Sequence, residues 1–382
     1  MSADPTVSVA LAPDSPRTRA TEWDQVVRAA GGGLFHSAAW LRAYERAGVH
    51  RSRPYHLVAR AGERLVGVLP CYLTAGCPRL QAMRGQLVDR PTWLDEPMLL
   101  SHALAAYYGG PLALADAACA LDALVEAFGR LAADLGVSAH GFVNVPPTQP
   151  ALLATLRRHG YVLRYHSSCM VLPLPWRTFD EYLASLPGKR RRMVNAMERR
   201  SEASGMVAEL VGRPPDLETL SELEASVLRR HGHLTPSSFP SPYLRVLVEE
   251  LDGSARFLVV RRLDGSPSLF FLVLDDGTCL SPWVAGIDYD RLRPDEPYHH
   301  AYRWLIRYGI GQRYRQIDMG RGSYRFKTRY GFARRELSFA LATSRAECRR
   351  ELARWSDDFE RNQRARYDRE FPVHATPPIF PG

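Results

Sequence analysis

Lysine is rare in this chain, and its two occurrences are candidates for chemistry. Of the 50 lysine and arginine residues, only Lys189 and Lys327 are lysine. An ammonium group is a compact point donor, whereas a guanidinium group is a broad planar fork that does not fit where one atom must be contacted. Lys327 is therefore a candidate for contact with a single atom. Lys189 opens the run KRRR, for which a solvated face or the steering of a polyanion are both open interpretations.

Lys327 lies in the segment GRGSYRFKTRYGF, where Arg321, Arg325 and Arg329 are able to hold phosphate groups. Acyl transfer to an amine needs a donor for the oxyanion that develops at the carbonyl group, and the Lys327 ammonium is the best donor available. The aromatic residues of the segment alternate with polar ones and predict a half-buried strand; they are Tyr324, Phe326, Tyr330 and Phe332. A core role for Phe326 is the alternative to a functional one.

The reaction must also remove a proton from the nitrogen, and Asp318 is the candidate for this step. It ends a short apolar run just before Gly320, a place where α/β folds present residues to ligands. A carboxylate that anchors the loop is the alternative and the simpler interpretation. The general base therefore stays open.

Five further residues are candidates for binding the acceptor. Trp283 lies in an apolar strand-like run, and Asp288 and Tyr289 open the loop that follows it. His231 and His233 follow a predicted helix; a metal site would need more ligands than the sequence offers, so no metal is predicted.

The elements that must position these residues alternate between helices and strands. The second half of the chain predicts a helix over 178–205, a strand over 206–212, a hairpin over 255–277, a strand over 279–286, a helix over 297–309 and strands over 315–320 and 335–342. A similar hairpin at 56–73 begins a looser version of the same order. We therefore expect an α/β (α+β) fold of two tandem domains, with mixed sheets flanked by helices. The predicted boundaries are a loose segment 1–20, domains 21–175 and 176–345, the second carrying the site, and a charged C-terminal helix and tail 346–382.

Composition limits the classes of protein that remain. The chain has 382 residues, 46% hydrophobic and 24% charged, as is typical of globular proteins. Its net charge of +9 favours phosphate-bearing partners, RNA among them. No stretch is apolar enough to span a bilayer, and the six cysteines form no C-x-x-C pair. We expect a cytoplasmic location, no membrane span and no DNA partner.

Three segments resemble the double GNAT-fold acyltransferases, a group that includes the Fem-type peptidyltransferases. They are Phe35–Trp40 (F-H-S-x-x-W), the KRRR helix, and the ending from Asp318 to Phe332 (DMGRGSYRFKTRYGF). The resemblance implies two GNAT-like domains and the use of aminoacyl-tRNA. In Fem-type enzymes a Phe-Lys pair works at the ester to be aminolysed, and it falls here on Phe326 and Lys327. Phe326 would stack on a terminal adenine, a contact worth on the order of 1 to 3 kcal/mol.

Two departures from the patterns of these families bear on which acyl donor is expected. CoA-dependent GNAT enzymes cradle pyrophosphate in an Arg/Gln-x-x-Gly-x-Gly/Ala turn before a helix, whereas DYDRLRPDEP stands at that place here. The long coiled-coil arm of some Fem enzymes is also missing.

Three hypotheses about function remain open at this stage. We expect an aminoacyltransferase that forms an amide from aminoacyl-tRNA and a small amine, either a cell-wall precursor or a secondary metabolite, without a cofactor. An N-acyltransferase that uses acyl-CoA or an acyl carrier is the alternative. A non-catalytic RNA- or partner-binding module is the third hypothesis.

Overall fold

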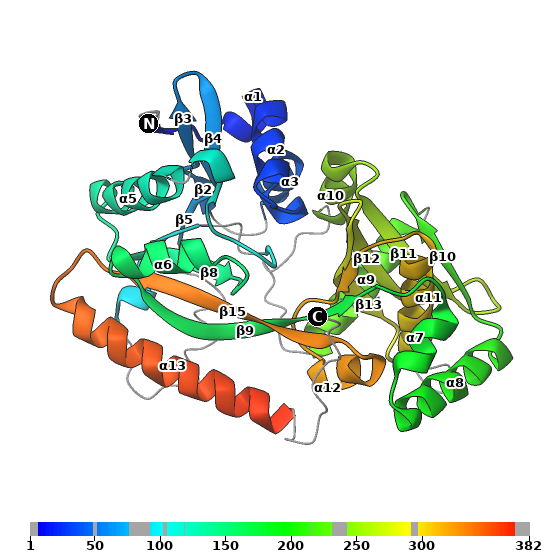
Figure 1. The fold of residues 1–382 in the computed structure, drawn as a ribbon. Coiled ribbons are helices and arrows are strands. Elements are labelled where there is room, and N and C mark those ends of the chain that lie inside the picture. Colours follow the sequence, from blue (N-terminus) through cyan, green and yellow to red (C-terminus); the bar gives the residue numbers. More distant parts are fainter. Residues whose placement is uncertain are drawn as a thin grey trace. The chain divides into compact units, whose positions relative to one another are not determined.

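The computed structural model describes residues 7–48, 52–75, 92–101, 105–117, 119–214, 216–230, 243–291 and 297–370. The chain forms two compact units (Figure 1). Unit 1 contains residues 1–168 and 335–369, and unit 2 contains residues 169–334 and 370–382. The chain passes from unit 1 to unit 2 within β9 (Val162–Pro173) and returns within β15 (Ala333–Ala342).

Unit 1 is a mixed α/β unit. Besides its parts of β9 and β15, its strands are β1 (Val7–Leu11), β2 (Ser52–Pro54), β3 (Leu57–Ala61), β4 (Arg64–Leu69), β5 (Tyr72–Thr74), β6 (Met98–Leu100), β7 (Leu112–Ala113) and β8 (Ala139–Val145). Its helices are α1 (Ser15–Thr18), α2 (Ala20–Ala29), α3 (Ala38–Ala47), α5 (Cys119–Asp134), α6 (Pro150–Arg158) and α13 (Cys348–Glu370). One antiparallel sheet has the order β1-β3-β4-β7, and a second run has the order β15-β8-β6-β5-β2.

The N-terminal segment was expected to be loose over residues 1–20. In the structure, residues Val7–Leu11 of this segment form the strand β1, which pairs with β3. The charged helix α13 covers a sheet, as expected, and buries Leu352, Trp355 and Phe359 against β8 and β15. A helix buries such an apolar stripe even when its other face is highly charged.

Unit 2 carries the predicted site. Besides its part of β9, its strands are β10 (Val207–Val211), β11 (Ala255–Arg261), β12 (Pro267–Asp275), β13 (Cys279–Ile287) and β14 (Gln316–Asp318), in the order β10-β11-β12-β13-β14-β9. Its helices are α7 (Phe179–Ser185), α8 (Gly188–Ala203), α9 (Leu217–Arg230), α10 (Tyr243–Leu251), α11 (Pro297–Gly311) and α12 (Tyr324–Lys327). The sheet is antiparallel except that β13 and β14 run parallel, so it is mixed and flanked by helices, as predicted.

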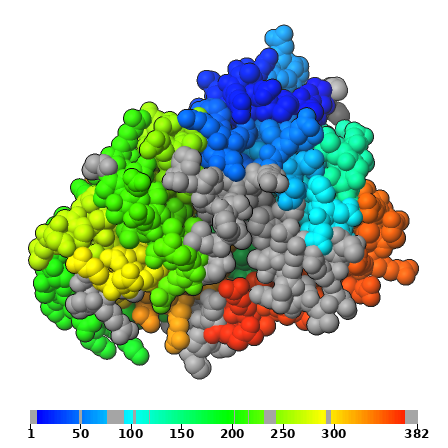
Figure 2. Space-filling model, turned by 180° about the vertical axis from the view of Figure 1, so that it is seen from behind, coloured from blue at the N-terminus to red at the C-terminus, as the bar shows by residue number. Residues whose placement is uncertain are grey.

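Helices cover both faces of this sheet. Ala285 packs in the core cluster that contains Ala301, Tyr302 and Leu305 of α11, whereas a Cβ on Gly286 would lie 2.8 Å from the backbone nitrogen of Glu224 in α9. Successive residues of a strand point to opposite faces, so α11 and α9 lie on opposite faces of β13. The segment with β10, α9 and α10 forms the green to yellow-green surface in Figure 2.

Two predicted elements of unit 2 were wrong. The single helix over 178–205 is two helices, because Pro187 cannot continue a helix and α7 ends at Ser185. The predicted strand with alternating aromatic residues is the helix α12 followed by a 3-10 turn, Thr328–Tyr330, and β15 starts only at Ala333. Among the helices of the described residues, none has the length and apolar character needed to cross a bilayer.

Candidate active site

The parallel strands β13 and β14 diverge toward their carboxyl ends. Their parallel ladder consists of two residue pairs, Cys279 with Gln316 and Leu280 with Ile317. Beyond these pairs β13 continues to Ile287 along β12, while β14 ends at Asp318. Ligands bind where neighbouring parallel strands diverge at their carboxyl ends. The residues that follow these pairs on both strands therefore form the candidate site.

A β-bulge shapes the β13 side of this site. The register between β12 and β13 shifts at Trp283, because Leu272 pairs with Val284 and Val273 pairs with Pro282. A bulge adds one residue and re-aims its side chain. The Trp283 ring is half-buried and lies 6.2 Å, centroid to centroid, from the ring of Tyr243 in α10. Trp283 therefore faces the α10 side of the sheet.

Lys327 lies on the β14 side, and its ammonium group is a hub for backbone carbonyl groups. Nζ donates to the carbonyl oxygens of Met319 at 2.7 Å, Gly320 at 3.2 Å and Arg321 at 3.0 Å. An ammonium group has three donors, so these contacts use all of them. Lys327 holds the loop after β14 against α12, and the single-atom contacts that its rarity suggested are made with the backbone.

Burial gives this ammonium group unusual electrostatics. The side chain of Lys327 is buried, and this burial lowers its pKa to about 8, although Cys169 and Asp318 act in the opposite direction. Asp318 is fully buried, and its Oδ1 accepts a 2.9 Å hydrogen bond from the Gly320 nitrogen. Asp318 therefore anchors the same loop that Lys327 clamps.

Phe326 belongs to an aromatic cluster between α12 and α11. Its half-buried ring lies 4.8 Å from the ring of His299, 5.1 Å from Tyr302 and 5.3 Å from Tyr298. Tyr324, also half-buried, packs on the edge of the same core. Phe326 thus contributes to the core with one part of its ring and keeps another part accessible.

The arginines of the segment have different exposures. Arg325 and Arg329 are exposed and Arg321 is partly buried. The Arg329 guanidinium carbon lies 5.9 Å from the Phe326 ring centroid. On α8, Lys189, Arg191 and Arg192 are exposed as well. The exposed cations among them carry positive charge on the surfaces of α12 and α8.

The other predicted acceptor residues lie near the end of β13. Asp288 pairs with buried Arg262, with 3.0 Å between the Asp288 Oδ2 and Arg262 NH2 atoms, and so fastens the end of the strand. The guanidinium carbon of Arg230, the last residue of α9, lies 4.4 Å from the Tyr289 ring centroid. His231 and His233 lie outside the described residues.

Sequence reasoning missed Glu224, a buried carboxyl group on α9, whose backbone nitrogen lies close to Gly286 of β13. Its side chain is hydrogen-bonded to the hydroxyl group of Tyr243. Burial raises the pKa of Glu224 to about 7, partly offset by that hydrogen bond. A signal was present, because Glu224 stands four residues after Leu220 and three before Val227, at the helical spacing of the apolar stripe.

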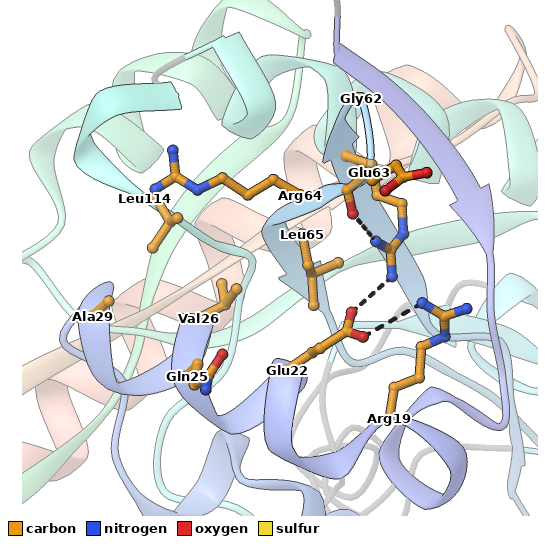
Figure 3. Close-up of a pocket in the computed structure, with 11 residues that line it drawn as sticks. Arg19, Glu22, Gln25, Val26, Ala29, Gly62, Glu63, Arg64, Leu65 and Leu114 are labelled. Carbon is orange, nitrogen blue, oxygen red and sulfur yellow. Dashed lines mark hydrogen bonds and ion pairs between the residues drawn. The ribbon is translucent and has the colours of Figure 1, made fainter.

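A separate pocket of about 870 Å³ lies in unit 1, between α2 and the β3–β4 hairpin (Figure 3). Its arginines are compensated inside the unit. Glu22 pairs with Arg60 at 2.9 Å and with Arg19 at 3.5 Å (Figure 3). Outside the lining, Asp116 pairs with Arg64 at 2.9 Å. This pocket brings together none of the predicted site residues.

The structure and a family model agree on the class of protein. Residues 188–328, which span α8 to the 3-10 turn after α12, match the family model described as an acetyltransferase (GNAT) domain. No curated protein matches the chain. Unit 2 therefore has the GNAT fold over these residues, as the resemblance to the double GNAT-fold group implied.

Solved structures extend this fold over most of the chain. FemX is 14% identical with a TM-score of 0.59, and the match covers 84% of this chain and 95% of that chain. L-PGS from Bacillus licheniformis is 14% identical with a TM-score of 0.56, and the coverage is 87% and 93%. A tandem GNAT protein from the clavulanic acid biosynthesis pathway is 13% identical with a TM-score of 0.52, and the coverage is 88% and 98%. At these identities the likeness establishes the fold alone.

Proposed function

We propose that unit 2 transfers an aminoacyl group from aminoacyl-tRNA to a small amine and forms an amide. The observation that carries this proposal is the parting of β13 and β14 with Phe326 and Lys327 beside it, at the positions that the Fem-type resemblance assigns to the ester. The similarity in fold to FemX supports it. No cofactor is needed, since the ester of aminoacyl-tRNA is already an activated acyl donor.

The donor would be held by the α12 segment. The accessible part of the Phe326 ring offers a surface on which a terminal base can stack, and Arg325 and Arg329 lie exposed nearby for the phosphates. Arg321 is placed to contribute through the loop that Lys327 clamps. The result is an ester carbonyl group positioned next to the ammonium group of Lys327.

Lys327 would act by exchanging partners. Its three donors are on backbone carbonyls, so the oxyanion that develops during attack takes the place of one of them. The ammonium group is already desolvated, so its attraction to the negative charge that develops in the transition state would favour this exchange. Asp318 would act through the loop it anchors, as a positioning residue.

The second candidate is an N-acyltransferase that takes its acyl group from acyl-CoA or an acyl carrier. The family match over residues 188–328 and the similarity to the clavulanic acid pathway protein favour it. In this case the same loop and ammonium group would serve a thioester. The third candidate, a binding module without catalysis, keeps the fold but requires no turnover.

A transfer assay separates the three candidates. The protein is incubated with radiolabelled pooled aminoacyl-tRNA or with labelled acetyl-CoA, each with and without ribonuclease, and with amino acids, amino sugars and polyamines as acceptors. The proposal predicts label in an amide product from charged tRNA only, and loss of the product with ribonuclease. Transfer from acetyl-CoA that is insensitive to ribonuclease contradicts it, and no transfer from either donor favours the binding module.

The basic surface gives a second, independent test. If several arginine-phosphate contacts hold tRNA, log K falls linearly with log salt as counterions are released. Affinity for tRNA that is absent at low salt, or that is independent of ionic strength, would mean that the net charge serves solubility only.

A further inference from the structure

The ring of Phe326 is an aromatic surface whose orientation is fixed by its neighbours on α11. Its centroid lies 4.8 Å from that of His299, 5.1 Å from that of Tyr302 and 5.3 Å from that of Tyr298. His299 is itself held, because its Nδ1 atom is hydrogen-bonded to the hydroxyl group of the fully buried Tyr330. The Phe326 ring is only half-buried. Its accessible part is therefore a preformed surface for stacking.

Arg329 lies over this surface, on the 3-10 turn that follows α12. Its guanidinium carbon is 5.9 Å from the centroid of the Phe326 ring, and its side chain is exposed. Among the residues that the structure describes, no carboxylate pairs with Arg329. A cation–π contact extends to about 6 Å from the ring centroid, so this contact is at its outer limit. The guanidinium group is close to the ring without being packed on it.

The space between these two groups fits one flat ring after a small movement. Stacked planes lie about 3.5 Å apart, so a ring between Phe326 and Arg329 requires a separation of about 7 Å. The present distance of 5.9 Å is about 1 Å shorter than this requirement. The exposed Arg329 side chain has no ion pair to break when it moves by that amount, whereas the Phe326 ring is fixed. We call this space the stacking slot.

We propose that Phe326 and Arg329 hold a purine base of the acyl donor between them, and that Arg329 sets the preference for a purine. This inference rests on the proposed function and deepens it, because it gives Arg329 a contact with the base in place of the phosphate contact that its charge alone suggests. Nucleobases bind proteins by stacking on aromatic rings and on guanidinium planes. A purine offers more surface than a pyrimidine to both neighbours, so stacking on two sides favours it.

Adenine can reach the stacking slot from two kinds of acyl donor. It is the terminal base of aminoacyl-tRNA, which ends in CCA, and it is also part of acyl-CoA. Stacking between two flat groups does not depend on the release of counterions, whereas a contact between arginine and phosphate does. Loss of the slot should therefore weaken binding without changing its salt dependence.

Isothermal titration calorimetry with short ligands tests the slot without any transfer reaction. The ligands are the ribonucleotides CCA and CCU, coenzyme A, and phosphopantetheine, which lacks the adenine. The wild type should bind CCA about tenfold more tightly than CCU. Arg329→Lys keeps the charge and loses the plane, so it should remove most of this preference and leave the salt dependence unchanged. The matched control is Arg245→Lys, at an exposed arginine of α10, which should bind like the wild type.

The outcomes separate the slot from the proposed function. The slot is overturned if the wild type binds neither CCA nor coenzyme A, or if the affinity for both is the same in Arg329→Lys as in the wild type; the acyltransferase is then still decided by the transfer assay. Affinity for coenzyme A but not for phosphopantetheine or CCA, lost in Arg329→Lys, keeps the slot and rejects tRNA as the donor. A preference for CCA that depends on Arg329, without transfer from charged tRNA, keeps the slot and rejects the aminoacyltransferase. Thermal unfolding checks that Arg329→Lys folds like the wild type.

Discussion

Each unit buries a glutamate that accepts a hydrogen bond from a tyrosine, and the two carboxyl groups have opposite properties. In unit 1, Glu45 contacts the hydroxyl group of Tyr72 at 3.1 Å. In unit 2, Glu224 contacts the hydroxyl group of Tyr243. Residue type and the tyrosine partner are shared, and the Glu45 side chain is also mostly buried, at 8% exposed. The difference must therefore come chiefly from the remaining neighbours.

Glu45 is surrounded by further donors. His56 Nε2 lies 3.0 Å from its Oε1, and Arg17 NH2 lies 3.1 Å from its Oε2. His56 is itself fixed, because its Nδ1 accepts a hydrogen bond from the Cys71 nitrogen and Nε2 is left to donate. Burial acts to raise the pKa of Glu45, but His56, Tyr72 and Arg17 together hold it below its ordinary value. These partners favour the ionised form of Glu45 and use its hydrogen-bonding capacity within the fold.

Glu224 lacks such a set of cations among the described residues, and burial raises its pKa to about 7. The comparison teaches that burial alone does not identify a functional carboxyl group. A carboxylate that is fully paired inside the fold is part of the structure, whereas one that is incompletely paired has capacity for a proton or a ligand.

Lys327 complicates this contrast, because it lies in unit 2 but is as fully paired as Glu45. Its three donors are occupied by backbone carbonyls. Its proposed role in catalysis therefore requires an exchange of partners.

The largest expected effect is the loss of activity when Lys327 is substituted. Lys327 is fully paired within the fold, so a large loss would show that full pairing does not by itself exclude a catalytic role. Lys327→Ala should lower kcat by about 10² to 10³-fold, the range typical of losing one oxyanion donor. It also leaves three backbone carbonyl groups without their donor, so some loss of stability and a higher KM for the donor are expected as well. Lys327→Arg should not restore the rate fully, because a planar fork cannot occupy the position of the ammonium group. Steady-state kinetics and thermal unfolding are measured for both variants. A fully active Arg variant would reduce Lys327 to a clamp for the loop, and a fully active Ala variant would remove it from the site.

The next effect concerns stability and sharpens the comparison of the two glutamates. Glu224 has a pKa of about 7 in the folded protein and 4.5 as its ordinary value. Between these values the unfolded chain releases a proton that the folded protein keeps, so stability falls as pH rises from 4.5 to 7. The full loss corresponds to about 3 kcal/mol. Glu224→Gln should therefore be more stable than the wild type at pH 8, by up to that amount, and similar at pH 4.5; denaturant unfolding at the two pH values checks this.

The same substitution in unit 1 should have the opposite sign. Glu45→Gln loses the attraction to His56 and Arg17 and leaves both without a charged partner, which costs about 1.5 to 3 kcal/mol at pH 8. Unfolding by denaturant under the same conditions gives the comparison directly. If both glutamine variants change stability in the same direction, the distinction between the two carboxyl groups fails.

The smallest effect comes from the tyrosine partners. The Tyr243 hydrogen bond lowers the pKa of Glu224, so Tyr243→Phe should move it above about 7. Tyr72→Phe should leave the pKa of Glu45 below its ordinary value, because His56 and Arg17 remain. Each variant should lose about 0.5 to 1.5 kcal/mol of stability. Titration of the carboxyl carbons by NMR reports the pKa changes, and an unchanged Glu224 pKa in Tyr243→Phe would contradict the assigned hydrogen bond.

Much of the fold of unit 2 could be predicted from the sequence. Apolar periodicity and turn residues placed the hairpin of β11 and β12, the strand β13 and the helix α11 within a few residues of their bounds. The aromatic residues from Tyr324 to Phe332 misled, because alternation over so few residues also fits a short helix and a 3-10 turn that pack on one core. Pro187 was the available signal that α7 and α8 are separate.

The site was harder to predict, for physical reasons. The rarity of lysine singled out Lys327, but its partners are backbone carbonyls eight, seven and six residues earlier, and no pattern of side chains encodes them. Asp318 was placed correctly at the end of a strand, with the anchoring contact that the simpler interpretation expected. Glu224 depends on tertiary burial between α9, α10 and β13, which the helix pattern indicates only as one charged residue in an apolar stripe.

The most direct test of this account is a pH titration of Glu45 and Glu224 in the same sample. The protein is labelled with ¹³C at the glutamate side-chain carboxyl carbons, and the two signals are assigned with Glu45→Gln and Glu224→Gln. The account predicts that the Glu224 signal titrates at about pH 7, while the Glu45 signal titrates below the ordinary pKa of a glutamate. A Glu224 signal that titrates at or below pH 4.5, or a Glu45 signal that titrates above it, would contradict the contrast between the two carboxyl groups.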